Sequence, residues 1–163
     1  MVPAQSKAEP CSDFKLPLEV QQKLSTAYAG WKIVTSALLP AEDRQTWLEC
    51  CARDCPGIIR GRFTDDADGY VVNLIRTTGE KRFQQIVYFR PTRDGFDIIT
   101  VCPSAMRGPI LVISKGPPGT YKDGYTGRTV KAQRDVIFTA QIDGRAWVDY
   151  WDGSRFRDIT TSI

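Results

Sequence analysis

The chain has 163 residues, with 22 basic and 19 acidic side chains, five cysteines and no histidine. A chain of this length can bury a core without cross-links, and its 42% hydrophobic content excludes wholesale disorder. The absence of histidine excludes Ser-His-Asp and Cys-His catalysis, His-ligated zinc and a histidine pH switch. We therefore expect a binding protein without a cofactor, not an enzyme.

The N-terminal segment is polar and contains proline, so we expect residues 1–15 to form a flexible tail and residues 16–163 a single domain. It lacks the apolar run of a signal peptide. The chain is therefore either a cytosolic protein with a loose tail or a mature exported protein whose leader has been removed. No stretch approaches the roughly 18 apolar residues that a membrane helix needs, so no membrane span is expected.

The first predicted element is an amphipathic helix. Apolar residues recur at four-residue spacing from Leu16 to Tyr28, Pro17 suits a first helical turn, and Gly30 suits a helix end. A short strand is expected over residues 31–35. Residues 40–55 are compatible either with a second helix or with a loop held by cysteines.

From Gly57 onward the hydrophobic period changes to two, which predicts strands. Turn signals, among them Asp143-Gly144 and Asp152-Gly153, separate the runs. The spacing leaves no room for crossover helices, so we predict an α+β fold in which the helix packs on one twisted antiparallel sheet of about six to eight strands. The expected strands cover residues 70–76, 83–89, 96–101, 110–114, 136–142, 146–151 and 156–160.

The cysteines favour disulfide bonds. Adjacent Cys50 and Cys51 are not expected to bond to each other, because a disulfide needs Cα atoms about 4.4–6.8 Å apart. One of them could pair with Cys11, and another member of the cluster, which includes Cys55, with Cys102. The alternatives are reduced core cysteines or a metal site, although paired CxxC spacing is absent. Two disulfides would place the protein in the periplasm or outside the cell.

The segment Gly116-Pro-Pro-Gly-Thr-Tyr-Lys-Asp123 imitates a nucleotide-binding loop. Tyr121, however, occupies a glycine position where the backbone must approach phosphate, and Asp123 replaces the hydroxyl that binds magnesium. The following residues break a helix. We therefore expect residues 116–127 to be a long exposed loop, serving as a contact surface or a connector.

Residues 61–70 form an Asp-rich segment before a predicted strand. Asp65, Asp66 and Asp68 could supply oxygen ligands to calcium, but the DxDxDG alternation is not kept and Arg62 adds a positive charge. The other interpretation is an acidic turn whose carboxylates face solvent.

Several short motifs resemble the small exported bacterial proteins related to FG-GAP repeats. They are Gly30-Trp-Lys-Ile, Pro56-Gly-Ile-Ile-Arg-Gly61 followed by the Asp-rich segment, Tyr70-Val-Val-Asn-Leu-Ile, and Tyr150-Trp-Asp-Gly-Ser-Arg-Phe156. The chain departs from that pattern in the Asp-rich segment, where Arg62 replaces the first aspartate. The resemblance implies export and a compact β-rich domain, and proteins of this kind include inhibitors and immunity proteins.

We therefore expect an exported protein-binding protein, such as a periplasmic inhibitor or immunity protein that neutralises a toxic enzyme targeting the cell envelope. The basic residues are too dispersed for a nucleic-acid site. The alternative is a calcium- or carbohydrate-binding surface module that uses the aspartates or the aromatic cluster around Trp147 and Trp151, which could equally pack in the core. Candidate contact residues are Arg60, Arg62, Arg93, Asp94, Arg107, Tyr121, Lys122, Asp123 and Tyr125.

Overall fold

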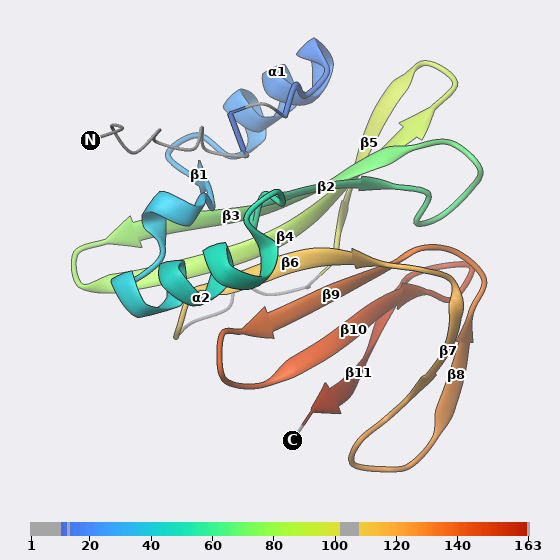
Figure 1. Ribbon diagram of the computed structural model, residues 1–163. Coiled ribbons are helices and arrows are strands. Elements are labelled where there is room, and N and C mark those ends of the chain that lie inside the picture. The colour runs from blue at the N-terminus through green and yellow to red at the C-terminus, as the bar shows by residue number, and fades with distance from the viewer. Residues whose placement is uncertain (1–10, 13, 102–107, 163) are drawn as a thin grey trace, which may run out of the picture.

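The computed structural model describes residues 11–12, 14–101 and 108–162 (Figure 1). Within these ranges the chain forms two α-helices, one 3-10 helix and eleven strands, all paired in antiparallel fashion. The elements are α1 (Leu18–Ala27), β1 (Lys32–Ile33), η1 (Ser36–Leu38), α2 (Ala41–Cys51), β2 (Ile58–Gly61), β3 (Gly69–Thr78), β4 (Lys81–Thr92), β5 (Gly95–Thr100), β6 (Leu111–Gly116), β7 (Gly119–Lys122), β8 (Thr129–Ala132), β9 (Val136–Gln141), β10 (Ala146–Trp151) and β11 (Phe156–Ser162).

The strands form three sheets, where the sequence pattern predicted one. In the first sheet the order is β1-β3-β4-β5, and β2 also pairs with β3. The second sheet has the order β11-β10-β9-β6, and β7 pairs with β8 to form a two-stranded arm. A single twisted sheet of this many strands would have to curl or split, and here the split lets the two larger sheets bury their facing sides against each other.

The predicted turns are confirmed where local chemistry specifies them. Gly79 connects β3 to β4 with a φ of 62°, and Asp143 adopts a φ of 57° between β9 and β10. Gly153 has a φ of 105° between β10 and β11. Glycine and aspartate tolerate this left-handed region better than most residues do, so these hairpins follow directly from the sequence.

The helix at the N-terminal end is confirmed, but it covers less of the sheet than expected. Val20 is the fully buried side chain of α1, while Leu24 and Tyr28 are half-buried on the first sheet and Leu18 is 68% exposed. In Figure 1, α1 lies near β5 at one side of the sheet. The uncertain region 40–55 is helical from Ala41 to Cys51, with Trp47 as its buried anchor.

The core lies between the two larger sheets. Val71, Ile86 and Tyr88 of the first sheet meet Ile113 and Ile137 of the second. The hydrophobic period of two predicts that each of these side chains faces a core. It does not predict which sheet each one packs against, because the strands lie far apart in the sequence.

A buried amide pair joins the sheets inside this core. Asn73 Nδ2 donates hydrogen bonds to Leu111 O (2.8 Å) and Pro56 O (3.3 Å), and Gln84 Nε2 donates to Asn73 Oδ1 (3.2 Å). The backbone N–H of Leu111 in turn donates to Gln84 Oε1 at 2.7 Å. Both amides are almost completely buried. This network fixes β6 against β3 and β4 and therefore sets the distance between the sheets.

The expected exposed loop at residues 116–127 is wrong at Gly119–Lys122, which form strand β7 of the arm, while most of the remaining residues are exposed. Tyr121 and Val130 of the arm pack on Phe138, Val148 and Tyr150, on the outer side of the second sheet. Tyr121 and Phe138 meet edge to face, with ring centroids 5.9 Å apart. Each strand of the arm is only four residues long, so the alternation of its side chains is short. The Gly and Pro residues of this segment therefore favoured the prediction of a loop.

Candidate functional site

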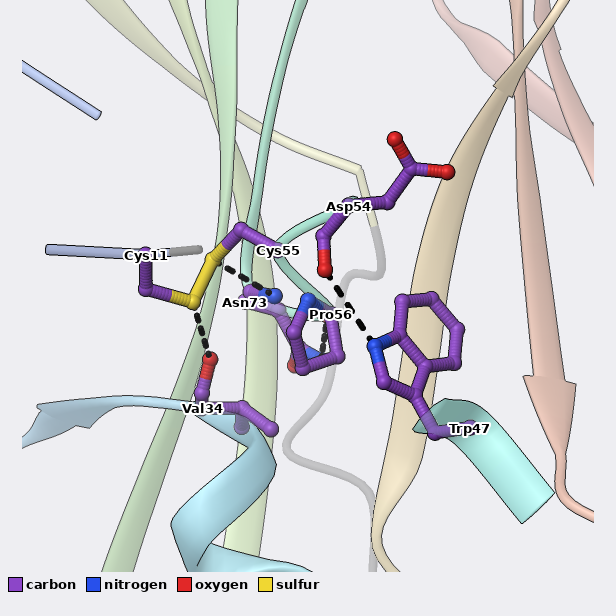
Figure 2. The surroundings of a disulfide bond; sticks show 8 residues. Cys11, Val34, Trp47, Asp54, Cys55, Pro56 and Asn73 are labelled. Atoms are coloured by element: carbon purple, nitrogen blue, oxygen red, sulfur yellow. Dashed lines mark hydrogen bonds between the residues drawn. A yellow bond between two sulfur atoms is a disulfide. The ribbon is translucent and has the colours of Figure 1, made fainter. Parts of the chain in front are cut away.

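The cysteine pairing differs from the expected one. Cys11 is bonded to Cys55, with Cα atoms 4.7 Å apart, and Cys50 is bonded to its neighbour Cys51. Cys55 precedes β2 and lies beside Cys11 (Figure 2), whereas the other two lie at the end of α2, so Cys11 meets the third member of the cluster. The expected partner Cys102 lies outside the described residues.

The Cys11–Cys55 bond holds the N-terminal segment against the first sheet. Both cysteines are buried in a cluster that includes Val20 and Ile58. The bond brings Phe14 and Lys15 to the place where β2 and β6 lie next to each other. Residues predicted to be a tail therefore form one wall of the site described next.

A groove runs along the seam between β2 and β6. Near the seam, Ile113 N of β6 donates to Pro56 O just before β2, and Asp135 N just before β9 donates to Arg62 O just after β2, both at 3.1 Å. A hollow of about 720 Å³ and a second one of about 330 Å³ lie here and share Phe14, Arg60 and Lys115 in their walls. We call this the seam groove; its lining includes Phe14, Lys15, Arg53, Arg60, Tyr70 and Lys115 together with the acidic residues Asp54 and Asp68.

The walls of the seam groove combine aromatic rings with cations. Phe14 and Tyr70 meet edge to face, with centroids 6.2 Å apart, and the Arg60 guanidinium lies 6.0 Å from the Tyr70 ring centroid. The Lys115 side chain lies across the backbone of Gly61, where an added Cβ would come within 2.9 Å of Lys115 Cδ. A glycine at the end of β2 thus makes room for a cation from β6.

Positive charge in the groove is only partly neutralised. Arg60 forms an ion pair with Asp68 at 3.1 Å. For the exposed cations Lys15, Arg53 and Lys115, the part of the chain that the structure describes provides no ion-pair partner. These three charges lie around an apolar floor, where a negatively charged group would gain both charge pairing and ring contacts.

The carboxylates of the Asp-rich segment beside the groove form ion pairs with arginines. Asp65 pairs with Arg90 at 3.5 Å, Asp66 with Arg134, and Asp68 with Arg60 and also with Arg62 at 3.6 Å. The Arg134 guanidinium holds the pKa of Asp66 below its usual value. Within the described ranges no group of three or more acidic or cysteine side chains is arranged to hold a metal.

The other predicted contact residues do not form one surface. Arg93 and Asp94 lie exposed in the β4–β5 turn, whereas Lys122 and Tyr125 lie near the far end of the arm (Figure 1). Arg107 lies outside the described residues. Of the predicted set, Arg60 contributes to the seam groove.

Two residues of the arm serve its own structure. Tyr121 donates a hydrogen bond from its hydroxyl to Pro117 O. Asp123 accepts from the backbone N–H groups of Thr126 and Tyr125, and these bonds lower the pKa of its carboxyl. Asp123 thus forms the turn of the arm, and the exposed Tyr125 remains available for contact.

The aromatic cluster around β10 is only partly core. Tyr150 is buried under the arm, whereas Trp147, Trp151 and Phe156 are half-buried, and Trp151 packs edge to face against Phe156 with centroids 5.1 Å apart. Asp149, between the two tryptophans in the sequence, is 6% exposed and accepts a hydrogen bond from Thr139 Oγ1 at 3.2 Å. A buried aspartate in this place was not expected from the sequence.

Sequence reasoning also missed most of the groove. The lining comes from four separate segments that no spacing in the sequence connects: Phe14 with Lys15, Arg53, Tyr70 and Lys115. The one sequence signal that could have indicated the groove was Lys115 near the end of an apolar strand. An outward-facing charge is common at such a position, so it did not single out a site.

Comparisons with protein-family models, curated proteins and solved structures yield no match to this chain. The resemblance to proteins related to FG-GAP repeats therefore stays a prediction. None of the helices in the described ranges has the length and apolar character that a membrane span requires.

Proposed function

We propose that the protein is an exported, non-enzymatic binding protein that holds an acidic surface of a partner protein in its seam groove. The role we propose is that of an inhibitor or immunity protein that neutralises a toxic enzyme. The observation that carries the proposal is a set of three cations, Lys15, Arg53 and Lys115, which have no ion-pair partner among the described residues. They lie around the rings of Phe14 and Tyr70.

The composition of the groove favours a protein partner. Protein interfaces concentrate binding energy in aromatic and arginine side chains surrounded by a polar rim, and the seam groove has both. A nucleic-acid site would instead extend as a long basic stripe along the phosphate backbone. Here the net charge is +3 and the neighbouring Asp-rich segment is fully ion-paired.

Preorganisation supports the same proposal. The Cys11–Cys55 bond and the ring contact between Phe14 and Tyr70 hold one wall of the groove before any partner arrives. An interface whose side chains are already ordered loses less conformational entropy on binding. The Cys11–Cys55 pair is also compatible with an oxidising compartment outside the cytoplasm, where a secreted inhibitor would act.

The test uses the full chain with its disulfides intact. Wild-type protein is compared with Lys15→Glu/Lys115→Glu in titration against the purified product of each gene adjacent to its own. A matched control, Lys32→Glu/Lys81→Glu, makes the same change in net charge at exposed positions away from the groove. We expect the groove variant to weaken binding at least tenfold and the control to bind like wild type.

Two results would contradict the proposal. One is equal weakening by the groove variant and the control, which would show a response to net charge alone. The other is the absence of binding to any neighbouring gene product together with a stabilisation by calcium, which would favour the surface-module alternative. Thermal unfolding of each variant confirms that it is folded.

A further inference from the structure

The outer edge strand of the first sheet is β5, and α1 lies near it without adding a strand to that edge. β5 pairs with β4, and no other strand in the described part of the chain pairs with it. Its six residues, Gly95–Thr100, include no lysine or proline, and Asp97 is the one charged side chain. Natural sheets normally protect such an edge with charge, proline or a covering segment, because its free N–H and C=O groups recruit another strand.

The register shows which groups are free. Val101 N donates to Ile86 O at 3.0 Å, so the hydrogen-bonded pairs along β4 and β5 alternate from that position. By this alternation Ile99 and Asp97 face β4 with their backbone groups. The backbone N–H and C=O groups that point away from β4 belong to Phe96, Ile98 and Thr100.

A positively charged hollow adjoins this edge. It measures about 490 Å³ and lies between the end of β5 and the start of β11. Arg157 in the lining is paired with Asp152, whereas Arg128 and Arg155 have no ion-pair partner among the residues described. The lining that matters here consists of Thr100, Arg128, Arg155, Phe156, Arg157 and Asp158.

We infer that the free edge of β5 is a second docking surface, which accepts an extended acidic segment of a partner protein as an added strand. The three outward-facing positions would supply backbone hydrogen bonds, and the arginines beside Thr100 would select carboxylate side chains. A second copy pairing through its own β5 would offer Asp97 as the one charged side chain of that strand, and the test below distinguishes it. This surface is separate from the seam groove and does not depend on it.

The test uses a defined probe, a capped peptide of alternating Glu and Val, with a Lys-Val peptide of equal length as its control. Binding is followed by titration calorimetry and by hydrogen exchange of the outward-facing amides. We expect the acidic peptide to slow exchange at Phe96, Ile98 and Thr100, and the basic peptide to have no effect. The groove variant Lys15→Glu/Lys115→Glu should bind the acidic peptide as wild type does.

Two variants separate the contributions of backbone and charge. Thr100→Pro removes one outward N–H at an exposed edge position, where proline is tolerated, and Thr100→Ala keeps it. We expect the proline variant to bind the acidic peptide at least tenfold more weakly than wild type does, and the alanine variant to bind it as wild type does. The double variant Arg128→Ala/Arg155→Ala truncates two exposed side chains and leaves the backbone unchanged. It should also weaken binding of the acidic peptide.

Three outcomes would overturn the inference. They are equal binding of both peptides, exchange protection that appears elsewhere but not on β5, and protection of β5 that depends on protein concentration without peptide. The last result would assign the edge to a second copy of the chain.

Discussion

Replacing Asp149 by Asn should stabilise the protein at neutral pH and remove a pH dependence that the wild-type chain carries. Asp149 lies on β10, opposite Asp158 of β11 and beside Thr139 of β9, and is 6% exposed. Burial, and after it the negative charge of Asp158, raises the pKa of Asp149 from 3.8 to about 7. Asn keeps the shape and the acceptor oxygen for Thr139 but cannot ionise.

The magnitude follows from the pKa difference between the folded and unfolded chains. In the unfolded chain the carboxyl ionises near 3.8 and in the folded chain near 7. Between these values the folded state binds more protons, so the free energy of unfolding falls as the pH rises through this window. At about 1.4 kcal/mol per pKa unit, the full cost above the folded pKa is on the order of 4 kcal/mol as an upper bound.

The assay is urea unfolding of wild type and Asp149→Asn across the pH window, with the disulfides kept oxidised. Below the unfolded pKa the two proteins should be equally stable, and the advantage of the variant should grow as the pH rises toward neutrality. Asp158→Asn removes the second cause of the shift, so it should narrow the pH window and reduce the total loss of stability across it. Parallel stability curves for wild type and Asp149→Asn across the window would refute the reasoning.

Two further predictions concern stability. Asn73→Leu should lower the free energy of unfolding by about 3 kcal/mol, because it removes three buried hydrogen bonds worth roughly 1 kcal/mol each. The control is Gln85→Leu at a half-buried position. If Asn73→Leu loses no more stability than this control, the bridging role of Asn73 is contradicted. Cys11→Ser should lower the free energy of unfolding, measured with denaturant, by about 4 kcal/mol, because the bond to Cys55 closes a loop with a sequence separation of 44. Equal stability of oxidised wild type and the variant would argue against the bond.

Local features of the fold were predictable because their causes are local. The turn at Asp143 and the hairpins around Gly79 and Gly153 follow from residues that tolerate a positive φ. The helix around Val20 follows from its apolar spacing and its flanking proline and glycine. In each case the residues that specify the element lie inside it or next to it.

Non-local features were not predictable for the converse reason. The partition into two large sheets depends on Asn73 and Gln84 reaching Leu111 across the core, and such a polar contact leaves no period in the sequence. The arm was missed because its packing partner, Phe138, is separated from it in the chain. The pairing of Cys11 with Cys55 depends on where the segment before β2 lies in space.

By itself the sequence determined a chain without histidine chemistry, antiparallel strands joined by Asp and Gly turns, and cysteines able to brace a helix against a sheet. The tertiary structure decided which charges are neutralised. It places arginines beside Asp65, Asp66 and Asp68, and within the described ranges it gives Lys15 and Lys115 of the groove no ion-pair partner. The physical reason is that charge pairing depends on distances of a few ångströms between segments far apart in the chain, which composition and spacing do not encode.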